Sequence, residues 1–214
     1  MRLLALDCCL DACQAAAVAD GVLLAEASEA MTRGHQERLA PMAGQVMSAA
    51  GLAFAELDAV AVTVGPGSFT GLRVGLAFAK GLALALEIPC IGVGTLAALA
   101  ASVEAGGRRA AVVANGRGEA WLQRFDGGTA LGAPETTATE ALASAGLIVG
   151  PTATSLAAPG QAAIDLAWPS PLAVALRAAT HPEPASPLYL RAPDARARSA
   201  KVGAGFAIRT RSES

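Results

Sequence analysis

Aromatic and charged residues are scarce in this sequence. Of its 214 residues, 4% are aromatic and 16% are charged, and the formal net charge is −2. Phosphate contacts need a positive surface, so strong binding of nucleic acid by this chain alone is not expected. Hydrophobic residues make up 53% of the chain, and alanine supplies much of that fraction. We therefore expect a globular protein whose helices and sheets pack closely through small side chains.

Long uninterrupted hydrophobic runs are also missing. The first apolar run would resemble a signal peptide, but Asp7 and Asp11 interrupt it. The longest apolar stretch is broken by Arg73, Lys80 and Glu87, so no segment reaches the roughly 18 apolar residues of a membrane span. These observations predict a cytoplasmic protein.

Metal ligands and catalytic histidines are few. The two histidines, His35 and His181, lie far apart in the sequence and form no His-x-x-x-His pair. The sequence therefore offers few candidate ligands for zinc and few candidate catalytic residues for a serine triad or a peptidase. We interpret His35 as a surface residue at the start of a helix. The cysteine spacing fits neither a metal knuckle nor a disulfide framework, so we interpret these residues as buried small hydrophobes. The cysteines are Cys8, Cys9, Cys13 and Cys90.

The first half of the chain predicts a mixed sheet. Three strands come first, with Asp20-Gly21 as a hairpin signal, and helix–strand alternation follows. The order strand–strand–strand–helix–strand–helix–strand–helix matches one lobe of the actin-like, ribonuclease-H-like (ASKHA) fold class better than a Rossmann fold. The expected strands are 2–6, 13–18, 22–27, 59–64 and 88–93, and the expected helices are 35–50 (with Pro41 inside), 70–86 and 95–104.

The second half predicts a smaller lobe. We place domain boundaries at 1–105 for the first lobe, 106–194 for the second and 195–214 for a basic, poorly ordered tail. Residues 191–214 hold six basic and two acidic residues, and such a tail is either simply solvated or touches RNA or an acidic partner. The expected elements are a hairpin of 110–114 and 119–125, a helix at 137–145, a strand at 147–149, a helix at 171–179 and an extended segment at 182–193.

A glycine-rich loop links the strand 59–64 to the helix 70–86. Gly65, Gly67 and Gly71 allow a close backbone approach, and Ser68 or Thr70 can cap the helix N-terminus. An anion could bind there. The Gly-x-Gly-x-x-x-Gly spacing is one residue off a dinucleotide fingerprint, and it is not a P-loop because no Gly-Lys-Ser/Thr follows.

The helix after this loop carries small residues at every fourth position: Gly71, Gly75, Ala79 and Ala83. They lie on one face, to which another element can come very near. Two interpretations remain open. The face packs on the protein's own sheet, or it binds a partner together with the helix 35–50.

Two further features have a structural and a functional interpretation. Asp7 ends the first strand, where actin-like ATPases keep a phosphate-side or magnesium-side carboxylate. Those proteins usually follow it with hydroxyl or glycine residues, whereas Cys8 and Cys9 follow here, so a structural turn aspartate is the favoured interpretation. The turn from Gly116 to Glu119 could hold a ligand or simply close a hairpin.

Several motifs together resemble the TsaB (YeaZ) family. They span positions 4 to 191, and the glycine-loop motif is the most specific of them. The motifs are Leu4-Ala5-Leu6-Asp7 with Ala12-Cys13, Arg33-Gly34-His35 with Leu39-Ala40-Pro41-Met42, Gly65-Pro66-Gly67-Ser68-Phe69-Thr70-Gly71-Leu72-Arg73-Val74-Gly75, and Pro187-Leu188-Tyr189-Leu190-Arg191.

The resemblance implies a two-lobed actin-like fold and a non-catalytic scaffold subunit without cofactors. It implies a heterodimer with the catalytic paralogue TsaD, recruitment of the small ATPase TsaE, and contact with tRNA only through the complex, which modifies the adenosine beside the anticodon. The sequence leaves open whether the chain forms a homodimer in isolation. The residues expected to bind the partner are Leu39, Met42, Val46, Gly71, Val74, Gly75, Phe78 and Ala79.

The chain departs from its relatives at several positions. Thr95 and Leu99 stand where the paralogue carries its His-x-x-x-His metal pair. Cys8 and Cys9 replace the family's hydroxyl-containing pair, and Ala114 replaces an aspartate. These departures weigh against nucleotide binding. The alternative function is an actin-like ATPase or kinase that binds nucleotide at Asp7 and the 65–71 loop.

Overall fold

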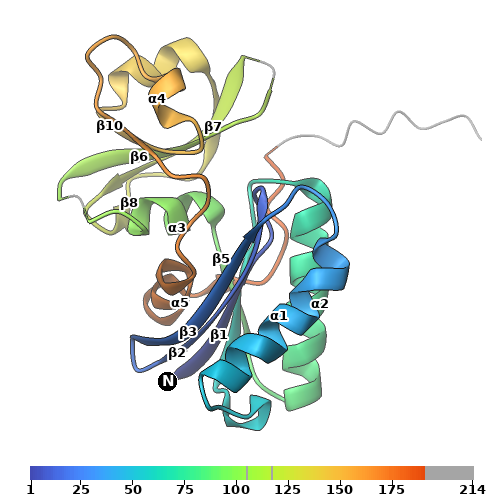
Figure 1. The fold of residues 1–214 in the computed structure, drawn as a ribbon. Helices are drawn as coiled ribbons and strands as arrows, with labels where there is room; N and C mark the ends of the chain where they lie inside the picture. Colours follow the sequence, from blue (N-terminus) through green and yellow to red (C-terminus); the bar gives the residue numbers. More distant parts are fainter. Residues whose placement is uncertain (105, 117, 191–214) are drawn as a thin grey trace, which may run out of the picture.

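A computed structural model describes residues 1–104, 106–116 and 118–190. The expected tail 195–214 lies outside these residues. Two mixed sheets organise the described chain, one below and one above in Figure 1. The two-lobed α/β prediction is thereby confirmed.

The first sheet has the strand order β12-β5-β4-β1-β2-β3. β1 is antiparallel to β2 and parallel to β4, and β4 is parallel to β5. This is the arrangement expected of an actin-like lobe, in which an antiparallel hairpin edge joins parallel crossovers. The strands are β1 (Arg2–Asp7), β2 (Ala12–Ala19), β3 (Val22–Ala30), β4 (Ala59–Thr63), β5 (Cys90–Val93) and β12 (Glu183–Pro184).

The first sheet is covered on both faces, which explains why its central strands are continuously apolar. Side chains alternate along a strand, so Leu4 and Leu6 pack under helices α1 (His35–Ala49) and α2 (Phe69–Leu86), whereas Leu3 and Ala5 pack under α5 (Pro171–Thr180). Figure 1 shows α1 and α2 side by side on one face and α5 on the other. Pro41 lies inside α1 without ending it.

Helix α2 is long and apolar enough to cross a membrane by length and composition, with a mean hydropathy of 1.4. Leu72, Leu76 and Ala79 on its inner side are buried in the core that they share with Leu4 and Val62 of the first sheet. The helix is therefore a core helix of this lobe.

The second sheet repeats the topology of the first. Its order is β11-β10-β6-β7-β8, with β9 also paired to β7. β6 is antiparallel to β7 and parallel to β10, as β1 is to β2 and β4. The strands are β6 (Arg108–Ala114), β7 (Glu119–Asp126), β8 (Thr129–Ala130), β9 (Glu135–Ala138), β10 (Leu147–Gly150) and β11 (Ala163–Asp165), and α4 (Ala153–Leu156) is the short helix beside them.

Helix α3 (Thr95–Ala101) lies between the two sheets (Figure 1). Leu96 and Leu99 of this helix share a cluster with Leu10 of the first lobe and with Val113 and Phe125 of the second. A single apolar cluster therefore joins the lobes.

Two sequence predictions about the second half are wrong. The helix 171–179 does not complete the second lobe, because Val174, Ala175 and Ala178 of α5 pack against the first sheet. The expected helix at 137–145 is instead strand β9 followed by a 3-10 helix, Thr139–Ser144.

Candidate functional site

The glycine loop packs against the turn that follows β1. A Cβ on Gly67 would lie 2.1 Å from the Cys9 carbonyl oxygen, and one on Gly71 would lie 1.9 Å from that of Cys8. The Ser68 amide donates to the Cys9 carbonyl at 2.7 Å, and Ser68 Oγ accepts from the Gly71 amide at 3.3 Å, which confirms the predicted cap. The close backbone approach inferred from the glycines is therefore made to the protein's own chain, and these contacts argue against a phosphate at this position.

Asp7 is also engaged within the lobe. The side chain is 1% exposed, and its Oδ1 accepts from Thr63 Oγ1 at 2.5 Å and from the Cys9 amide at 2.9 Å. When the Gln14 amide is oriented so that its oxygen accepts from Ser28 Oγ, its Nε2 donates to Oδ2 of Asp7 at 3.1 Å. Burial raises the pKa of Asp7, and these hydrogen bonds oppose the rise only in part. The arrangement favours the structural interpretation of Asp7 over a magnesium-side carboxylate.

Cysteines surround this aspartate. Cys8, Cys9 and Cys13 are buried, as interpreted from the sequence, whereas Cys90 is half-buried. Sγ of Cys8 lies 3.9 Å from Sγ of Cys13, and burial raises the pKa of Cys9 to about 12. A thiol with that pKa stays protonated at neutral pH, so Cys9 has little nucleophilic character.

The interpretation of His35 as a surface residue is wrong. The side chain is only 5% exposed, because α1 packs along β2 and β3 from its first residue onward. An electrostatic interaction with His35 acts to lower the pKa of Asp7, so the start of α1 belongs to the same buried polar region.

Most residues expected to bind a partner are buried within the lobe. Leu39, Met42 and Val46 of α1 are at most 2% exposed, and Gly71, Gly75 and Ala79 of α2 are buried as well. A Cβ on Gly75 would lie 3.6 Å from Cγ2 of Val62 in β4. The small-residue face therefore packs on the protein's own sheet, and its assignment as a docking face is corrected. Val74 and Phe78 remain partly exposed.

The outer sides of the same two helices carry a second set of small residues. Ala77, Gly81 and Ala85 of α2 are exposed and follow one another at every fourth position. A Cβ on Gly81 or on Gly44 of α1 would meet nothing within 4 Å, and the side chain of Leu84 is 81% exposed. We call this surface the outer helix face; its residues are Ala40, Gly44 and Ser48 of α1 and Ala77, Gly81, Leu84 and Ala85 of α2.

The sequence contained a signal for the outer helix face, because its small residues have the same spacing of four as the inner ones. Spacing alone could not show which of the two stripes covers the sheet. The structure shows that the inner stripe faces the sheet, because Gly71 of that stripe closely approaches the carbonyl of Cys8.

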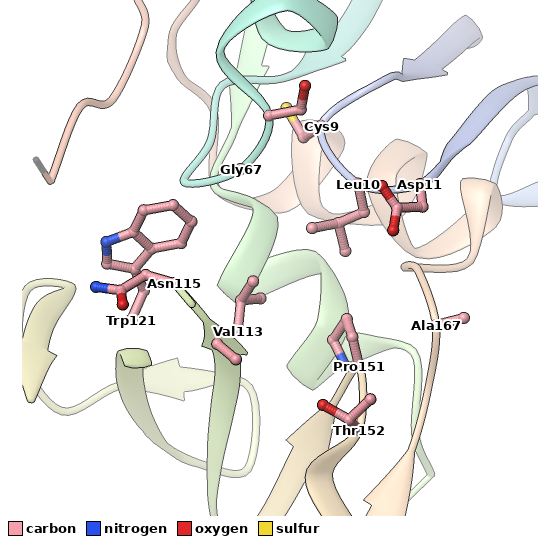
Figure 2. Close-up of a pocket in the computed structure, with 12 residues that line it drawn as sticks. Cys9, Leu10, Asp11, Gly67, Val113, Asn115, Trp121, Pro151, Thr152 and Ala167 are labelled. Carbon is pink, nitrogen blue, oxygen red and sulfur yellow. The ribbon is translucent and has the colours of Figure 1, made fainter. Parts of the chain in front are cut away.

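A pocket of about 390 Å³ lies between the lobes. Figure 2 shows Cys9 and Gly67 on the side of the first lobe and Asn115 and Trp121 on the side of the second. Among the described residues that line it, Asp11 is the one that carries a charge, so that part of the lining offers a carboxylate rather than a cation to a ligand. Asn115 donates to Glu119 at 2.9 Å, which fits the hairpin interpretation of this turn; Arg117 lies outside the described residues.

The positions of the paralogue's metal pair are buried in α3. Thr95 and Leu99 are both 0% exposed, and the Thr95 amide donates to the Gly65 carbonyl at 2.8 Å. Within residues 1–104, 106–116 and 118–190, no three His, Cys, Asp or Glu side chains are grouped so as to hold a metal ion.

Comparisons with known proteins match this chain to the TsaD family model and to TsaB proteins of tRNA threonylcarbamoyladenosine biosynthesis. The model of the TsaD family, described as tRNA N6-adenosine threonylcarbamoyltransferase, matches residues 23–177. The Escherichia coli tRNA threonylcarbamoyladenosine biosynthesis protein TsaB is 42% identical over 100 residues, which cover 47% of this chain and 43% of that protein. An uncharacterized protein of Mycobacterium tuberculosis H37Rv is 37% identical over 185 residues, which cover 83% of this chain and 84% of that one.

A solved structure extends the similarity over nearly the whole described chain. YeaZ from Pseudomonas aeruginosa superposes with a TM-score of 0.76 at 28% identity, covering 88% of this chain and 99% of that one. The alignment with the Escherichia coli relative, by contrast, spans less than half of its length.

Proposed function

Because this chain belongs to the TsaB (YeaZ) family, we propose that it is the scaffold subunit of an assembly that makes threonylcarbamoyladenosine in tRNA. It binds a catalytic paralogue of the TsaD type and holds that paralogue in its active arrangement. The small ATPase TsaE joins the assembly, and tRNA enters through the complex. The chain itself supplies no catalytic group and needs no cofactor.

The outer helix face is the observation that carries this proposal. It combines small side chains, which let another helix approach closely, with the exposed side chain of Leu84. Large apolar side chains left exposed in a contiguous patch are typical of interaction surfaces. Val74 and Phe78, which lie partly exposed on α2, extend the patch.

A helix pair from a partner of the same fold fits this face. α1 and α2 lie side by side (Figure 1), so two similar lobes can pack their helix pairs against each other about a pseudo-twofold axis. A second copy of this chain could occupy the same face when the paralogue is absent. The paralogue and the second copy are therefore expected to compete.

The test is reconstituted tRNA threonylcarbamoylation with the other purified components, with and without this chain. We expect activity to depend on the chain and light scattering to show a 1:1 complex. Gly81→Leu should abolish both, since its side chain would fill space that the partner occupies, while the isolated variant stays folded because nothing lies within 4 Å of that position. Full activity without the chain would contradict the proposal.

Ala179→Leu is the matched control. Ala179 is exposed on α5, which covers the opposite face of the first sheet, so this variant should assemble and function normally. Gly75→Leu is unsuitable as a test, because its side chain would collide with Val62 and disturb the fold. If Gly81→Leu still co-purifies with the paralogue, the outer helix face is not the docking site.

The ATPase alternative makes an opposite prediction. It requires Asp7 and the 65–71 loop to bind nucleotide, yet both are occupied by contacts within the lobe. Calorimetry with ATP and magnesium should therefore show no binding to this chain. Micromolar binding with turnover that is lost in Asp7→Ala would support the alternative.

A further inference from the structure

Helix α2 carries two cations and no carboxylate. Arg73 and Lys80 are the charged residues of its sequence, and both are exposed. Seven residues separate them, which is two helical turns, so they lie on the same side of the helix and about 10 Å apart along its axis. Ala77 and Leu84 of the outer helix face follow Arg73 by four and eleven residues and fall on the same line. The two cations therefore lie along the surface that we propose as the docking site.

Neither cation is neutralised by the part of the chain that the structure describes. Within that part, Arg73 and Lys80 take part in no ion pair. Helix α1 contributes Glu37 and Arg38, and Arg38 is already paired with Glu29 of β3. The helix pair thus presents two unpaired cations against one carboxylate, Glu37.

Arg73 is held in a fixed orientation. Its guanidinium carbon lies 3.7 Å from the Phe69 ring centroid, and its Nε donates to the Tyr189 hydroxyl at 3.2 Å. The terminal nitrogens, Nη1 and Nη2, have no hydrogen-bond partner among the described residues. They form a planar fork that can bind a carboxylate through two parallel hydrogen bonds. Because the side chain is oriented in advance, less conformational entropy is lost when a partner binds.

Tyr189 can hold Arg73 because its own segment is fixed to the lobe. The Leu188 amide donates to the Val64 carbonyl at 2.7 Å, and the Leu188 side chain packs against the core of the first lobe. Gly65 permits this approach, since a Cβ there would lie 2.9 Å from the Leu188 carbonyl oxygen.

The charge pattern suits an acidic helix better than a second copy of this chain. A second copy would bring another α2 with the same two cations to this surface, and like charges across an interface oppose association. A helix with two carboxylates at a spacing of seven residues would pair with both cations. The small residues Ala77 and Gly81 let such a helix approach closely. A phosphate chain would make no use of the apolar surface that Leu84 adds beside the cations.

We propose that Arg73 and Lys80 pair with carboxylates on the helix of the catalytic paralogue that packs along α2, and that this pairing favours the paralogue over a second copy of the chain. The inference rests on the proposed function. Salt screens attraction between opposite charges and repulsion between like charges. The complex with the paralogue should therefore weaken as salt rises, whereas self-association of the chain should strengthen.

The test is a calorimetric titration of the purified paralogue with the full chain at about 0.05 M and about 0.5 M NaCl, between which screening increases strongly. We expect Arg73→Glu and Lys80→Glu each to raise the Kd at low salt by about 30-fold or more, the equivalent of one interfacial charge pair. Both variants should also reduce the dependence of the Kd on salt. Arg73→Lys should keep that dependence and lose only part of the affinity, because an ammonium group lacks the planar fork.

Arg108→Glu is the matched control. It makes the same change of charge on the second lobe, where the Arg108 side chain is 80% exposed, and it should leave the Kd close to that of the wild type. Circular dichroism should show all the variants folded, since the substituted side chains are exposed. Sedimentation velocity of the wild-type chain alone, at the same two salt concentrations, measures self-association.

Equal Kd values for the three glutamate variants would overturn the inference, as would a wild-type complex that strengthens with salt. A dimer of the chain alone that is favoured at low salt would contradict the preference for the paralogue. Unchanged affinity of Arg73→Glu for the paralogue, together with weaker binding of labelled tRNA, would show that the cations face phosphates instead. If the wild-type chain forms no complex with the paralogue, the proposed function fails. A complex that forms but does not respond to either charge reversal refutes this inference alone.

Discussion

Two glycine-to-alanine changes within α2 should shift stability in opposite directions. In a helix interior, alanine is favoured over glycine by about 0.8–1.0 kcal/mol. At Gly81 nothing lies within 4 Å of the new Cβ, so Gly81→Ala should raise the free energy of unfolding by about 1 kcal/mol. For a chain of this length that corresponds to an increase in Tm of about 2–4 °C.

At Gly71 the same change meets the turn after β1. The new Cβ would lie 1.9 Å from the Cys8 carbonyl oxygen, so the backbone of the helix or of the turn must move by about 1 Å or more to reach a normal contact distance. Overpacking of this kind typically costs about 1–3 kcal/mol, and the shift also strains the hydrogen bond from Ser68 to Cys9. After the gain in helix propensity is subtracted, Gly71→Ala should still lower the free energy of unfolding.

Urea denaturation followed by circular dichroism measures both variants against the wild type. We expect the midpoint to rise for Gly81→Ala and to fall for Gly71→Ala, with unchanged m-values. If Gly71→Ala is as stable as the wild type, the glycine loop does not rest on the turn at Cys8 and Cys9. The argument against a phosphate site in that loop would then fail as well.

Two other changes test the interior of each lobe. Burial raises the pKa of Asp7 above its ordinary 3.8, so the native state holds the carboxyl proton more tightly than the unfolded chain does. The contribution of Asp7 to stability is therefore full below about pH 3.8 and is lost as pH rises through the native pKa. Asp7→Asn removes this pH dependence. The urea midpoint of the variant minus that of the wild type should therefore be larger at pH 7 than at pH 4. A larger difference at pH 4 would contradict the raised pKa of Asp7. Phe125→Ala should cost about 3–5 kcal/mol in thermal unfolding, since Phe125 is 1% exposed in the cluster that joins the lobes.

The first lobe could be predicted from the sequence because its strands are buried on both faces. The stretch Ala59–Thr63 is wholly apolar apart from its last residue, and the hairpin signal at Asp20-Gly21 falls between β2 and β3. Local patterns of this kind fix element order well. They do not fix which sheet a later helix covers, and α5 was assigned to the wrong lobe for that reason.

The repeated topology of the two sheets was likewise not visible in the sequence. β1 and β6 occupy equivalent central places, but the fold requires only apolar side chains there, and many sequences meet that requirement. Most residues expected to bind a partner lie on the inner side of α1 and α2, whereas the docking surface that we propose lies on the outer side of the same helices. Both sides carry small residues, and only the contact of Gly71 with Cys8 distinguishes the inner side from the outer one.

The return of α5 and β12 to the first sheet bears on how the protein folds during synthesis. β5 pairs with β12 through Gly92 and Glu183, so the edge of the first sheet stays open while the ribosome adds about 90 further residues, which takes roughly 5–18 s. A fragment that ends at residue 105 would lack Val174, Ala175 and Ala178, which cover Leu3 and Ala5. The second lobe is thus an insertion within the first. The nascent chain begins the first lobe before the second and completes it only after the second.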